Sequence, residues 1–467
     1  MLESKHFHFT GVCGTAMGAV AVAMKRKGFT VTGSDSNVYP PMSDFLRAEG
    51  IVISEGYRAE NLPSEADVIV IGNAISRGNE EAEAALSRRL LYQSLPEVMK
   101  EHFLRGKRNY VVSGTHGKTT TSSMLAWLFL SAGRDPGWMI GGLPKNLGRG
   151  AQFGDSEFNV LEGDEYDTAF FDKRSKFLHY LPEVAVVNNI EFDHADIYAS
   201  LDEIKLSFRR LLNVVPRNGL AIVNGDDPNC VDVSANAPCP VIKVGMGESN
   251  ELRITDLCYE ADRSSFNLGA VRYSLRMTGE FNVRNAAMAA AAASFAGLSA
   301  EEIREGLASF DGVARRQELR GEAGGVKVID DFAHHPTAIR LAVGSLRQRY
   351  PEGRLWILFE PRSNTTRRAV FQTELADALA LADQAVISEI PDLHKIPEND
   401  RLDPHRLAAD IGRHGGCGRY IPQIDQIVDT VIAEAREGDV VAVLSNGGFG
   451  GIHGKLLDAL ERSTRDR

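Results

Sequence analysis

Short apolar runs alternate with longer amphipathic runs along most of the chain. Near the N-terminus, residues 7–10 predict a strand, residues 11–18 a glycine-rich turn, the residues up to Gly28 a helix, and residues 30–32 a second strand. This succession is the βαβ unit that opens many parallel sheets. Asp35 follows the second strand, where dinucleotide-binding enzymes place an acid that contacts ribose.

The middle of the chain repeats this pattern after a change in composition. Residues 101–109 are polar and basic, so we expect a linker there and a second domain starting close to it. Strands are predicted at residues 110–113, 158–161, 184–187 and 220–223, and the alanine-rich residues 285–296 predict a long helix. Such alternation is typical of helices that cover a largely parallel sheet.

A third region of the same type follows Arg316. Strands are predicted at residues 326–329, 355–359, 385–387 and 440–444, with helical runs between them. The predicted fold class is therefore α/β with three domains. We expect a Rossmann-like N-terminal domain at residues 1–107, a central P-loop ATPase-type α/β domain at residues 108–313, and a Rossmann-like C-terminal domain at residues 314–467.

Composition narrows the class of protein. The 467 residues suffice for about three domains, and 43% of them are hydrophobic. The formal net charge of -11 argues against a broad nucleic-acid-binding surface. Five cysteines without a C-x-x-C pair indicate a reducing compartment. Residues 1–6 have no apolar core, and no stretch approaches about 18 apolar residues, so we expect a cytoplasmic protein without a membrane partner.

The most informative motif is a candidate phosphate-binding loop between a predicted strand and a predicted helix. It consists of Gly114, Thr115, His116, Gly117, Lys118, Thr119 and Thr120. A strand that turns through glycines into a helix directs backbone N–H groups at phosphate, the lysine adds positive charge, and the next hydroxyl can bind Mg2+. Val112 stands where the common motif has its first glycine, so this is a shortened variant. A glycine-rich turn without function is the alternative interpretation.

Two further strands are expected to end in polar groups. Residues 158–161 precede four carboxylates, namely Glu162, Asp164, Glu165 and Asp167. Residues 184–187 precede the segment from Asn188 to His194. Carboxylate oxygens suit Mg2+, and the ends of parallel strands meet at one edge of a sheet. A metal site beside the phosphate loop is therefore predicted, with a solvated acidic turn as the alternative.

Candidate binding residues also lie in the outer domains. The N-terminal turn carries Cys13 at the second glycine position of a nicotinamide fingerprint, which favours a diphosphate-bearing ligand over NAD or a purely structural turn. Arg315 and Arg316, together with residues 330–336, are candidates for an interdomain cleft, where an arginine can neutralise a transferring phosphoryl group.

Together these motifs resemble the Mur ligase family over the whole chain. The resemblance lies in the short phosphate loop, in residues 188–194 as an N-x-x-x-D-H segment, in residues 279–285 as a G-x-x-N-x-x-N segment, and in residues 331–336 as a D-Y-x-H-H-P segment. Residues 164–177, 359–365 and 445–453 are similar to the branch of the family that transfers a murein tripeptide. Where the alanine-adding branch typically reads P-H-R-Y-T-R, this chain has Ser363 and Thr366 at the two arginine positions, so a larger acceptor than alanine is expected.

The resemblance implies ATP-dependent amide formation, through an acyl phosphate, between UDP-N-acetylmuramate and L-alanyl-γ-D-glutamyl-meso-diaminopimelate, in peptidoglycan recycling. The implied cofactors are ATP and Mg2+. Besides the phosphate loop, ATP would meet Asn282, Asn285, Arg316 and Asp331; the metal would meet Thr119, Glu162 and His194; and the catalytic residues would be Lys118, His194, His335 and Arg316. The UDP-sugar would meet Gly14, Thr15, Ala16, Met17 and Asp35, and the carboxylates of the peptide would meet Arg362 and Arg367.

Three alternatives remain open at this stage. Within the family, an alanine-adding ligase is the close alternative. A P-loop kinase would use the same loop to make a stable phosphorylated product, and a nucleotide or UDP-sugar sensor would bind without stoichiometric release of ADP. The sequence predicts no oligomeric state.

Overall fold

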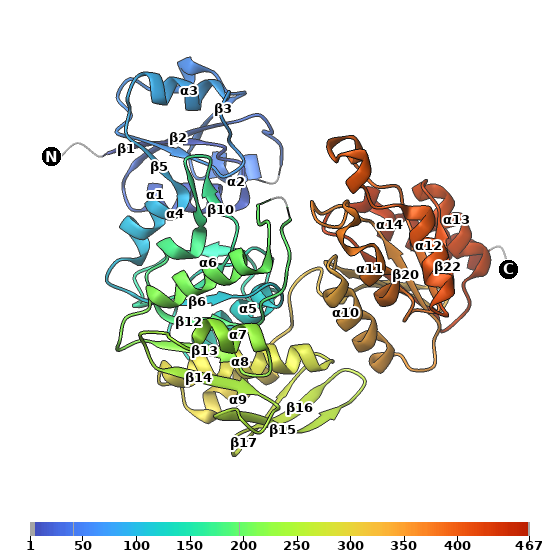
Figure 1. Cartoon of the computed structure of the whole chain (residues 1–467). Helices are drawn as coiled ribbons and strands as arrows, with labels where there is room; N and C mark the ends of the chain where they lie inside the picture. The colour runs from blue at the N-terminus through green and yellow to red at the C-terminus, as the bar shows by residue number, and fades with distance from the viewer. Residues whose placement is uncertain (1–4, 41, 196, 466–467) are drawn as a thin grey trace.

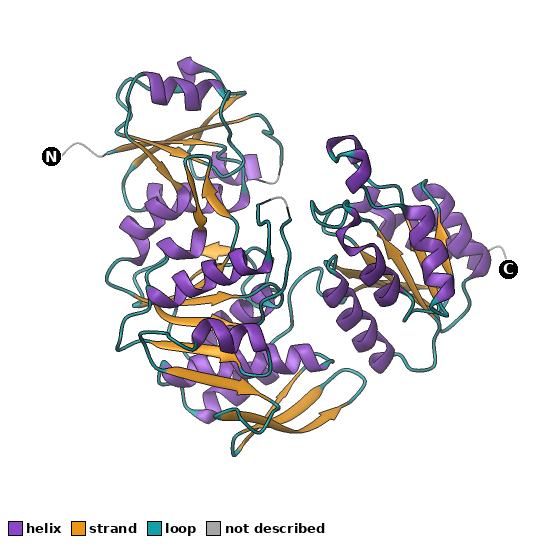
Figure 2. Cartoon of the chain, viewed as in Figure 1, coloured by secondary structure: helices purple, strands orange, loops and turns teal. Residues whose placement is uncertain are grey.

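The computed structural model describes residues 5–40, 42–195 and 197–465, which form three α/β domains (Figure 1). Residues 1–4, on which the expectation of no signal peptide partly rests, lie outside these ranges. Figure 2 shows helices on both sides of the sheets. Within the described ranges, every helix falls short of the length and apolar character needed to cross a bilayer.

The N-terminal domain is a five-stranded parallel sheet with the Rossmann-like order β3-β2-β1-β4-β5. Its strands are β1 (His6–Thr10), β2 (Thr30–Asp35), β3 (Val52–Glu55), β4 (Val68–Ile71) and β5 (Tyr92–Ser94). Its helices are α1 (Thr15–Arg26), α2 (Met42–Ala48), α3 (Glu80–Ser87) and α4 (Leu95–Met99). Asp35 is the last residue of β2 rather than a residue after it.

The central domain has a ten-stranded sheet with the order β17-β16-β15-β14-β13-β12-β6-β9-β7-β8. Neighbouring strands from β15 to β7 run parallel, whereas β16, β17 and β8 add antiparallel edges. The strands are β6 (Arg108–Ser113), β7 (Gly137–Met139), β8 (Ala151–Gln152), β9 (Phe158–Gly163), β12 (Pro182–Val187), β13 (Leu220–Asn224), β14 (Val241–Gly245), β15 (Leu252–Tyr259), β16 (Ser264–Leu268) and β17 (Val271–Leu275). The helices are α5 (Lys118–Ser131), α6 (Leu201–Asn213), α7 (Pro228–Ser234), α8 (Glu280–Phe295) and α9 (Ala300–Ala308).

Both faces of the central sheet are buried, which explains its continuous apolar strands. On β6, Tyr110 and Val112 join the core beneath α5 and α8, whereas Val111 joins the core on the opposite face. A separate hairpin, β10 (Asp167–Ala169) and β11 (Asp172–Ser175), reaches the N-terminal domain, where the rings of Phe171 and Tyr92 lie 4.8 Å apart.

The predicted linker at residues 101–109 is wrong. A π-helical turn covers Lys100–Leu104, and β6 already begins at Arg108. Phe103 and Leu104 are buried in a hydrophobic cluster that contains both Phe7 of β1 and Val111 of β6. The polar residues around these two apolar side chains concealed their role, and the N-terminal and central domains share one core. Figure 1 accordingly shows the first domain stacked on the second.

The C-terminal domain is a six-stranded sheet with the order β18-β19-β23-β20-β21-β22, of which only β18 is antiparallel. Its strands are β18 (Glu318–Ala323), β19 (Val326–Asp331), β20 (Leu355–Phe359), β21 (Gln384–Ile387), β22 (Gly418–Tyr420) and β23 (Val440–Leu444). Its helices are α10 (Pro336–Arg349), α11 (Gln372–Leu379), α12 (Pro404–Arg413), α13 (Ile424–Glu434) and α14 (Ile452–Arg465). Two hydrophobic clusters, one on each face, consist of residues of this domain alone.

Asp226 joins three elements of the central domain at the carboxyl edge of its sheet. It follows β13, accepts the N–H groups of Met246 (2.7 Å) and Gly247 (2.9 Å) after β14, and pairs with Arg284 of α8 at 2.5 Å. Burial opposes ionisation of this carboxyl, but these hydrogen bonds outweigh it and lower its pKa from 3.8 to about 2.

Replacement of Asp226 by asparagine should give a pH-dependent loss of stability. Because the folded pKa lies below the unfolded value, the stabilising contribution is complete above the unfolded pKa and disappears as the pH falls through the folded one. We expect Asp226→Asn to lower the free energy of unfolding by about 1 kcal/mol at neutral pH, a figure reduced for partial solvent exposure. Urea unfolding should show the difference from wild type shrinking between about pH 5 and about pH 2. Asp458→Asn, at an exposed position of α14, is the control for removal of a surface carboxylate. A constant difference for Asp226→Asn would contradict the assignment.

Candidate active site

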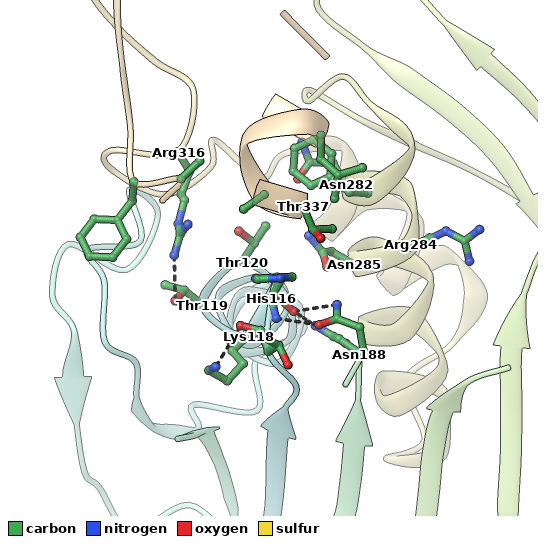
Figure 3. Close-up of a pocket in the computed structure, with 18 of the residues that line it drawn as sticks. His116, Lys118, Thr119, Thr120, Asn188, Asn282, Arg284, Asn285, Arg316 and Thr337 are labelled. Carbon is green, nitrogen blue, oxygen red and sulfur yellow. Dashed lines mark hydrogen bonds between the residues drawn. The ribbon is translucent and has the colours of Figure 1, made fainter. Parts of the chain in front are cut away.

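The phosphate loop connects β6 to α5 and depends on two glycines. Gly114 has φ +128° and Gly117 has φ +80°. A Cβ atom on Gly117 would lie 2.4 Å from Oδ1 of Asn285, and one on Gly114 would lie 3.0 Å from the backbone nitrogen of Asn188. Both the backbone angle and the close approach therefore require glycine. Figure 3 shows Lys118, Thr119 and Thr120 at the start of α5.

Lys118 is held by the loop and by a buried carboxylate. Its Nζ donates to the carbonyl oxygens of Gly114 (2.7 Å) and Thr115 (3.2 Å) and pairs with Glu165 at 2.8 Å. Burial alone would lower the pKa of Lys118, but the Glu165 carboxylate raises it above its ordinary value. The ammonium group therefore stays charged at the position where a phosphate would bind.

The structure brings Thr119 and Glu162 together, as the sequence predicts for a metal site. The Thr119 hydroxyl donates to Oε1 of Glu162 at 2.8 Å, and the backbone N–H of Gly141 donates to Oε2 at 2.6 Å. The carboxylate is thus fixed next to the hydroxyl, and both groups offer oxygen to a hard cation.

His194 is connected to Lys118 of the phosphate loop through Glu165. Its Nε2 lies 2.9 Å from Oε1 of Glu165, the carboxylate that also holds Lys118. The residue has φ +56°, so the chain turns sharply after Asp193 and directs the ring towards the end of β9. Glu165 therefore connects the phosphate loop with the segment after β12.

The segment at the start of α8 lies against the phosphate loop. Oδ1 of Asn285 accepts the hydroxyl of Thr121 at 3.2 Å. Asn282 donates to the carbonyl oxygen of Thr278 at 2.8 Å, while its buried Oδ1 has no hydrogen-bond partner among the described residues. An unsatisfied buried acceptor is costly, and a donor such as an adenine amino group would satisfy it.

The C-terminal domain contributes Arg316, Asp331 and His335. Nη2 of Arg316 points at the Thr119 hydroxyl from 3.5 Å, as Figure 3 shows. Asp331 accepts the N–H groups of Gln317 (2.8 Å) and Ala333 (2.7 Å), so it fixes the backbone beside Arg316. Arg315, the other arginine of the predicted pair, instead donates to the carbonyl oxygens of Ser445 and Gly447 and supports the loop after β23.

One cavity of about 1000 Å³ connects most of these groups. Its lining includes the loop residues from Thr115 to Thr120 and Glu162, His194, Asn282, Asn285, Arg316 and Asp331. Its walls come from the central and C-terminal domains, and Gly14, Thr15, Ala16, Met17 and Asp35, all described, are not part of them. Asp35 accepts the N–H of Cys13 at 2.9 Å and thereby fixes the N-terminal turn.

The predicted acceptor residues lie in the loop after β20. Ser363 and Thr366 bond to each other through their hydroxyls at 2.8 Å. Arg367 is largely buried beside Asn364, whereas the side chain of Arg362 is 49% exposed and lies 3.6 Å from Glu360. The hydroxyl of Thr365 donates to Asp193 of the central domain at 2.8 Å, which fixes this loop next to His194.

Four residues with central positions had no individual role assigned from the sequence: Glu165, Glu191, Asp193 and Thr365. Glu165, Glu191 and Asp193 lie in the segments after β9 and β12 that the sequence marks as polar strand ends. The position at a strand end was the available signal, but it does not tell which carboxylate faces Lys118. Thr365 lies in the segment 359–365 noted from the sequence, but its contact could not be predicted because its partner is 172 residues away.

Three family models match the chain in succession. "Mur ligase family, catalytic domain" matches residues 6–107, "Mur ligase middle domain" matches residues 112–293, and "Mur ligase, glutamate ligase domain" matches residues 315–447. The predicted fold class and family are thereby confirmed.

Relatives of known name match nearly the full length of the chain. The UDP-N-acetylmuramate–L-alanyl-γ-D-glutamyl-meso-2,6-diaminoheptandioate ligase of Haemophilus influenzae is 40% identical over 98% of this chain and 99% of its own. The UDP-N-acetylmuramate–L-alanine ligase of Geobacter sp. strain M21 is 33% identical over 95% of both chains. The crystal structure of a murein peptide ligase from Psychrobacter arcticus superposes with a TM-score of 0.72 and 35% identity over 98% of this chain and 99% of that one. Identity of this extent and coverage shows that the chain belongs to the Mur ligase family.

Proposed function

We propose that this chain joins L-alanyl-γ-D-glutamyl-meso-diaminopimelate to UDP-N-acetylmuramate, with hydrolysis of ATP to ADP and phosphate, in peptidoglycan recycling. As a member of the Mur ligase family it is an ATP-dependent ligase that forms an amide bond. The relative named as a tripeptide ligase is 40% identical, against 33% for the relative named as an alanine ligase. The proposal therefore places this chain in the tripeptide branch.

The contacts in the loop after β20, which contains residues 362–367, are the observation that supports the tripeptide over alanine as the acceptor. Ser363 and Thr366 satisfy each other's hydroxyl groups and leave no cation at either position. Arg362, half exposed at the same loop, offers a guanidinium to a carboxylate that lies further out, as a tripeptide provides. The bond from Thr365 to Asp193 fixes this loop beside His194, so an acceptor held there would have its amine near the phosphate loop.

ATP is proposed to bind in the large cavity, with its base at Asn282 and Asn285 and its phosphates at the loop. Lys118 and Arg316 bring positive charge to the transferring phosphoryl group from two domains. Asp331 holds the backbone beside Arg316 and would face the ribose. The γ-phosphoryl group passes to the lactyl carboxylate, and ADP leaves. The peptide amine then attacks the acyl carbon and displaces phosphate. His335 is proposed to lie near this amine.

Mg2+ is proposed to bind at Thr119 and Glu162, with His194 at a second position. The hydroxyl and the carboxylate are already adjacent and supply oxygen ligands of the kind this ion prefers. When bound, the ion neutralises phosphate charge. Glu165 keeps Lys118 and the ring of His194 in place.

The UDP-sugar is proposed to bind at the N-terminal turn. Gly14 caps α1 without a side-chain hydrogen bond, so the first N–H groups of the helix, from Thr15 to Met17, are available to a diphosphate. Asp35 holds the turn in this shape. The proposed substrates and ATP would be met in the cytoplasm. Cytoplasmic location is therefore part of this proposal.

A phosphate-release assay with UDP-N-acetylmuramate, MgATP and either tripeptide or L-alanine tests the acceptor. We expect turnover with the tripeptide and background release with alanine.

Arg362→Ala should raise the KM for tripeptide by about tenfold or more while the KM for ATP stays the same, because one charged hydrogen bond to the acceptor is lost. Turnover with alanine alone would assign the chain to the other branch, and a phosphorylated sugar accumulating without acceptor would indicate a kinase.

Removal of the lysine charge should abolish catalysis. Lys118→Ala is expected to lower kcat by about 1000-fold or more, equivalent to at least about 4 kcal/mol, because charge stabilisation of the transferring group is lost. The same phosphate-release assay measures the effect. The exposed Lys455→Ala, which removes a surface pair with Asp425, serves as the matched control and should retain wild-type turnover. Thermal unfolding of both variants separates loss of catalysis from loss of folding, and undiminished kcat in Lys118→Ala would refute the phosphate-loop assignment.

A further inference from the structure

Three side chains outside the proposed magnesium site meet where the central and C-terminal domains touch. His116 belongs to the phosphate loop, Glu191 to the segment after β12, and His335 caps the N-terminus of α10. One donor atom from each of the three lies within 4.8 Å of the others. Nε2 of His116 is 3.3 Å from Oε2 of Glu191, and Nδ1 of His335 is 3.6 Å from the same oxygen.

His335 is oriented as a metal ligand would be. Its Nε2 lies 3.2 Å from the carbonyl oxygen of Phe192, which can only accept, so Nε2 carries the proton. Nδ1 is therefore unprotonated; it accepts a 3.3 Å hydrogen bond from the N–H of Thr337 and lies 3.6 Å from Oε2 of Glu191. A ring that donates through one nitrogen to a backbone carbonyl while the other faces the ion is the usual arrangement of metal-binding histidines.

The other two ligands are also fixed by neighbours. The hydroxyl of Thr337 donates to Oε2 of Glu191 at 2.7 Å. The backbone of His116 is held on both sides by Asn189, whose Oδ1 accepts its N–H at 2.7 Å and whose Nδ2 donates to its carbonyl oxygen at 3.1 Å. The cluster thus has supporting contacts around its donor atoms.

The donor set selects against Mg2+. Two imidazole nitrogens and one carboxylate oxygen match the three-ligand sets of zinc, whereas Mg2+ prefers oxygen throughout and finds it at Thr119 and Glu162. Access exists from two sides. Glu191 and Thr337 line the large cavity and also a smaller one of about 230 Å³, which His335 and Phe371 line as well. A water can therefore complete the coordination.

We propose that His116, Glu191 and His335 bind a divalent transition-metal ion such as Zn2+, which links the phosphate loop to the C-terminal domain. The ligands come from both domains, so the bound ion joins the phosphate loop to the start of α10. Binding favours the arrangement in which all three donors are close and thereby stabilises it by mass action.

Metal binding to the untagged full-length chain tests this site. The chain is freed of metal with a chelator and kept in excess Mg2+ without nucleotide. Titration with Co2+ as a spectroscopic probe, then with Zn2+ by calorimetry, should show one saturable site, with visible absorption bands of low-coordinate Co2+ that Zn2+ abolishes. Zn2+ should also raise the thermal midpoint of the wild-type chain.

Variants connect the binding to these residues. His335→Ala and Glu191→Gln each remove a ligand and should weaken Zn2+ binding by about 100-fold or more, since loss of an outer-shell partner alone costs about 10- to 100-fold. Thr337→Val keeps the size of the side chain but removes the hydroxyl on Glu191, and should weaken binding by about tenfold. His405→Ala, which removes a histidine that meets the ring of Tyr420 edge to face, is the matched control and should bind as wild type.

The outcomes are decisive in both directions. Saturable binding that His335→Ala and Thr337→Val weaken in this order, but His405→Ala leaves unchanged, supports the site. Absence of saturable binding, or binding that is equal in wild type and Thr337→Val, overturns it even if His335→Ala fails to fold.

Discussion

The candidate active site depends on the buried contact between Lys118 and Glu165. A lysine ammonium and a carboxylate that are both nearly removed from water are stable only when each is paired and hydrogen-bonded. Here Lys118 also donates to two loop carbonyls, and Glu165 also contacts His194. This carboxylate therefore contacts both the phosphate loop and the segment after β12, which Asn189 joins as well. Without it, the loop would lose the contact that keeps its lysine directed into the cavity.

The C-terminal domain reaches this arrangement through a few directed polar contacts. Arg316 points at Thr119, Thr365 donates to Asp193, and Thr337 donates to Glu191. Each contact joins a side chain of the C-terminal domain or its entry to the start of α5 or to the segment after β12. The parallel topology explains this convergence, because the carboxyl ends of β6, β9 and β12 lie at one edge. Groups that are distant in the sequence thus meet around one cavity.

Much of the fold could be predicted from the sequence because strands buried on both faces are continuous apolar runs. The strands at residues 355–359 and 440–444 agree with β20 and β23 at both ends. The junction at residues 101–109 could not be predicted in this way, since Phe103 and Leu104 are isolated apolar residues among polar ones. The phosphate loop and the Thr119–Glu162 pair follow from local motifs. Glu165 and Thr365 do not, because their roles depend on partners that only tertiary structure brings near.

The core shared by Phe7, Leu104 and Val111 attaches the first domain to the second in a different way from the attachment of the third. Separating the first domain from the second would expose apolar surface, at about 25 cal/mol for each square ångström. The hydrophobic clusters of the third domain contain only its own residues, and the hydrogen bonds by which it meets the second are ones that water can replace. The first two domains are therefore joined through a common hydrophobic core, whereas the third meets them through polar and ring contacts such as Lys145–Glu318 and Phe192–Phe371. The loop that carries Arg362 thus belongs to the domain whose separation would expose the least hydrophobic core.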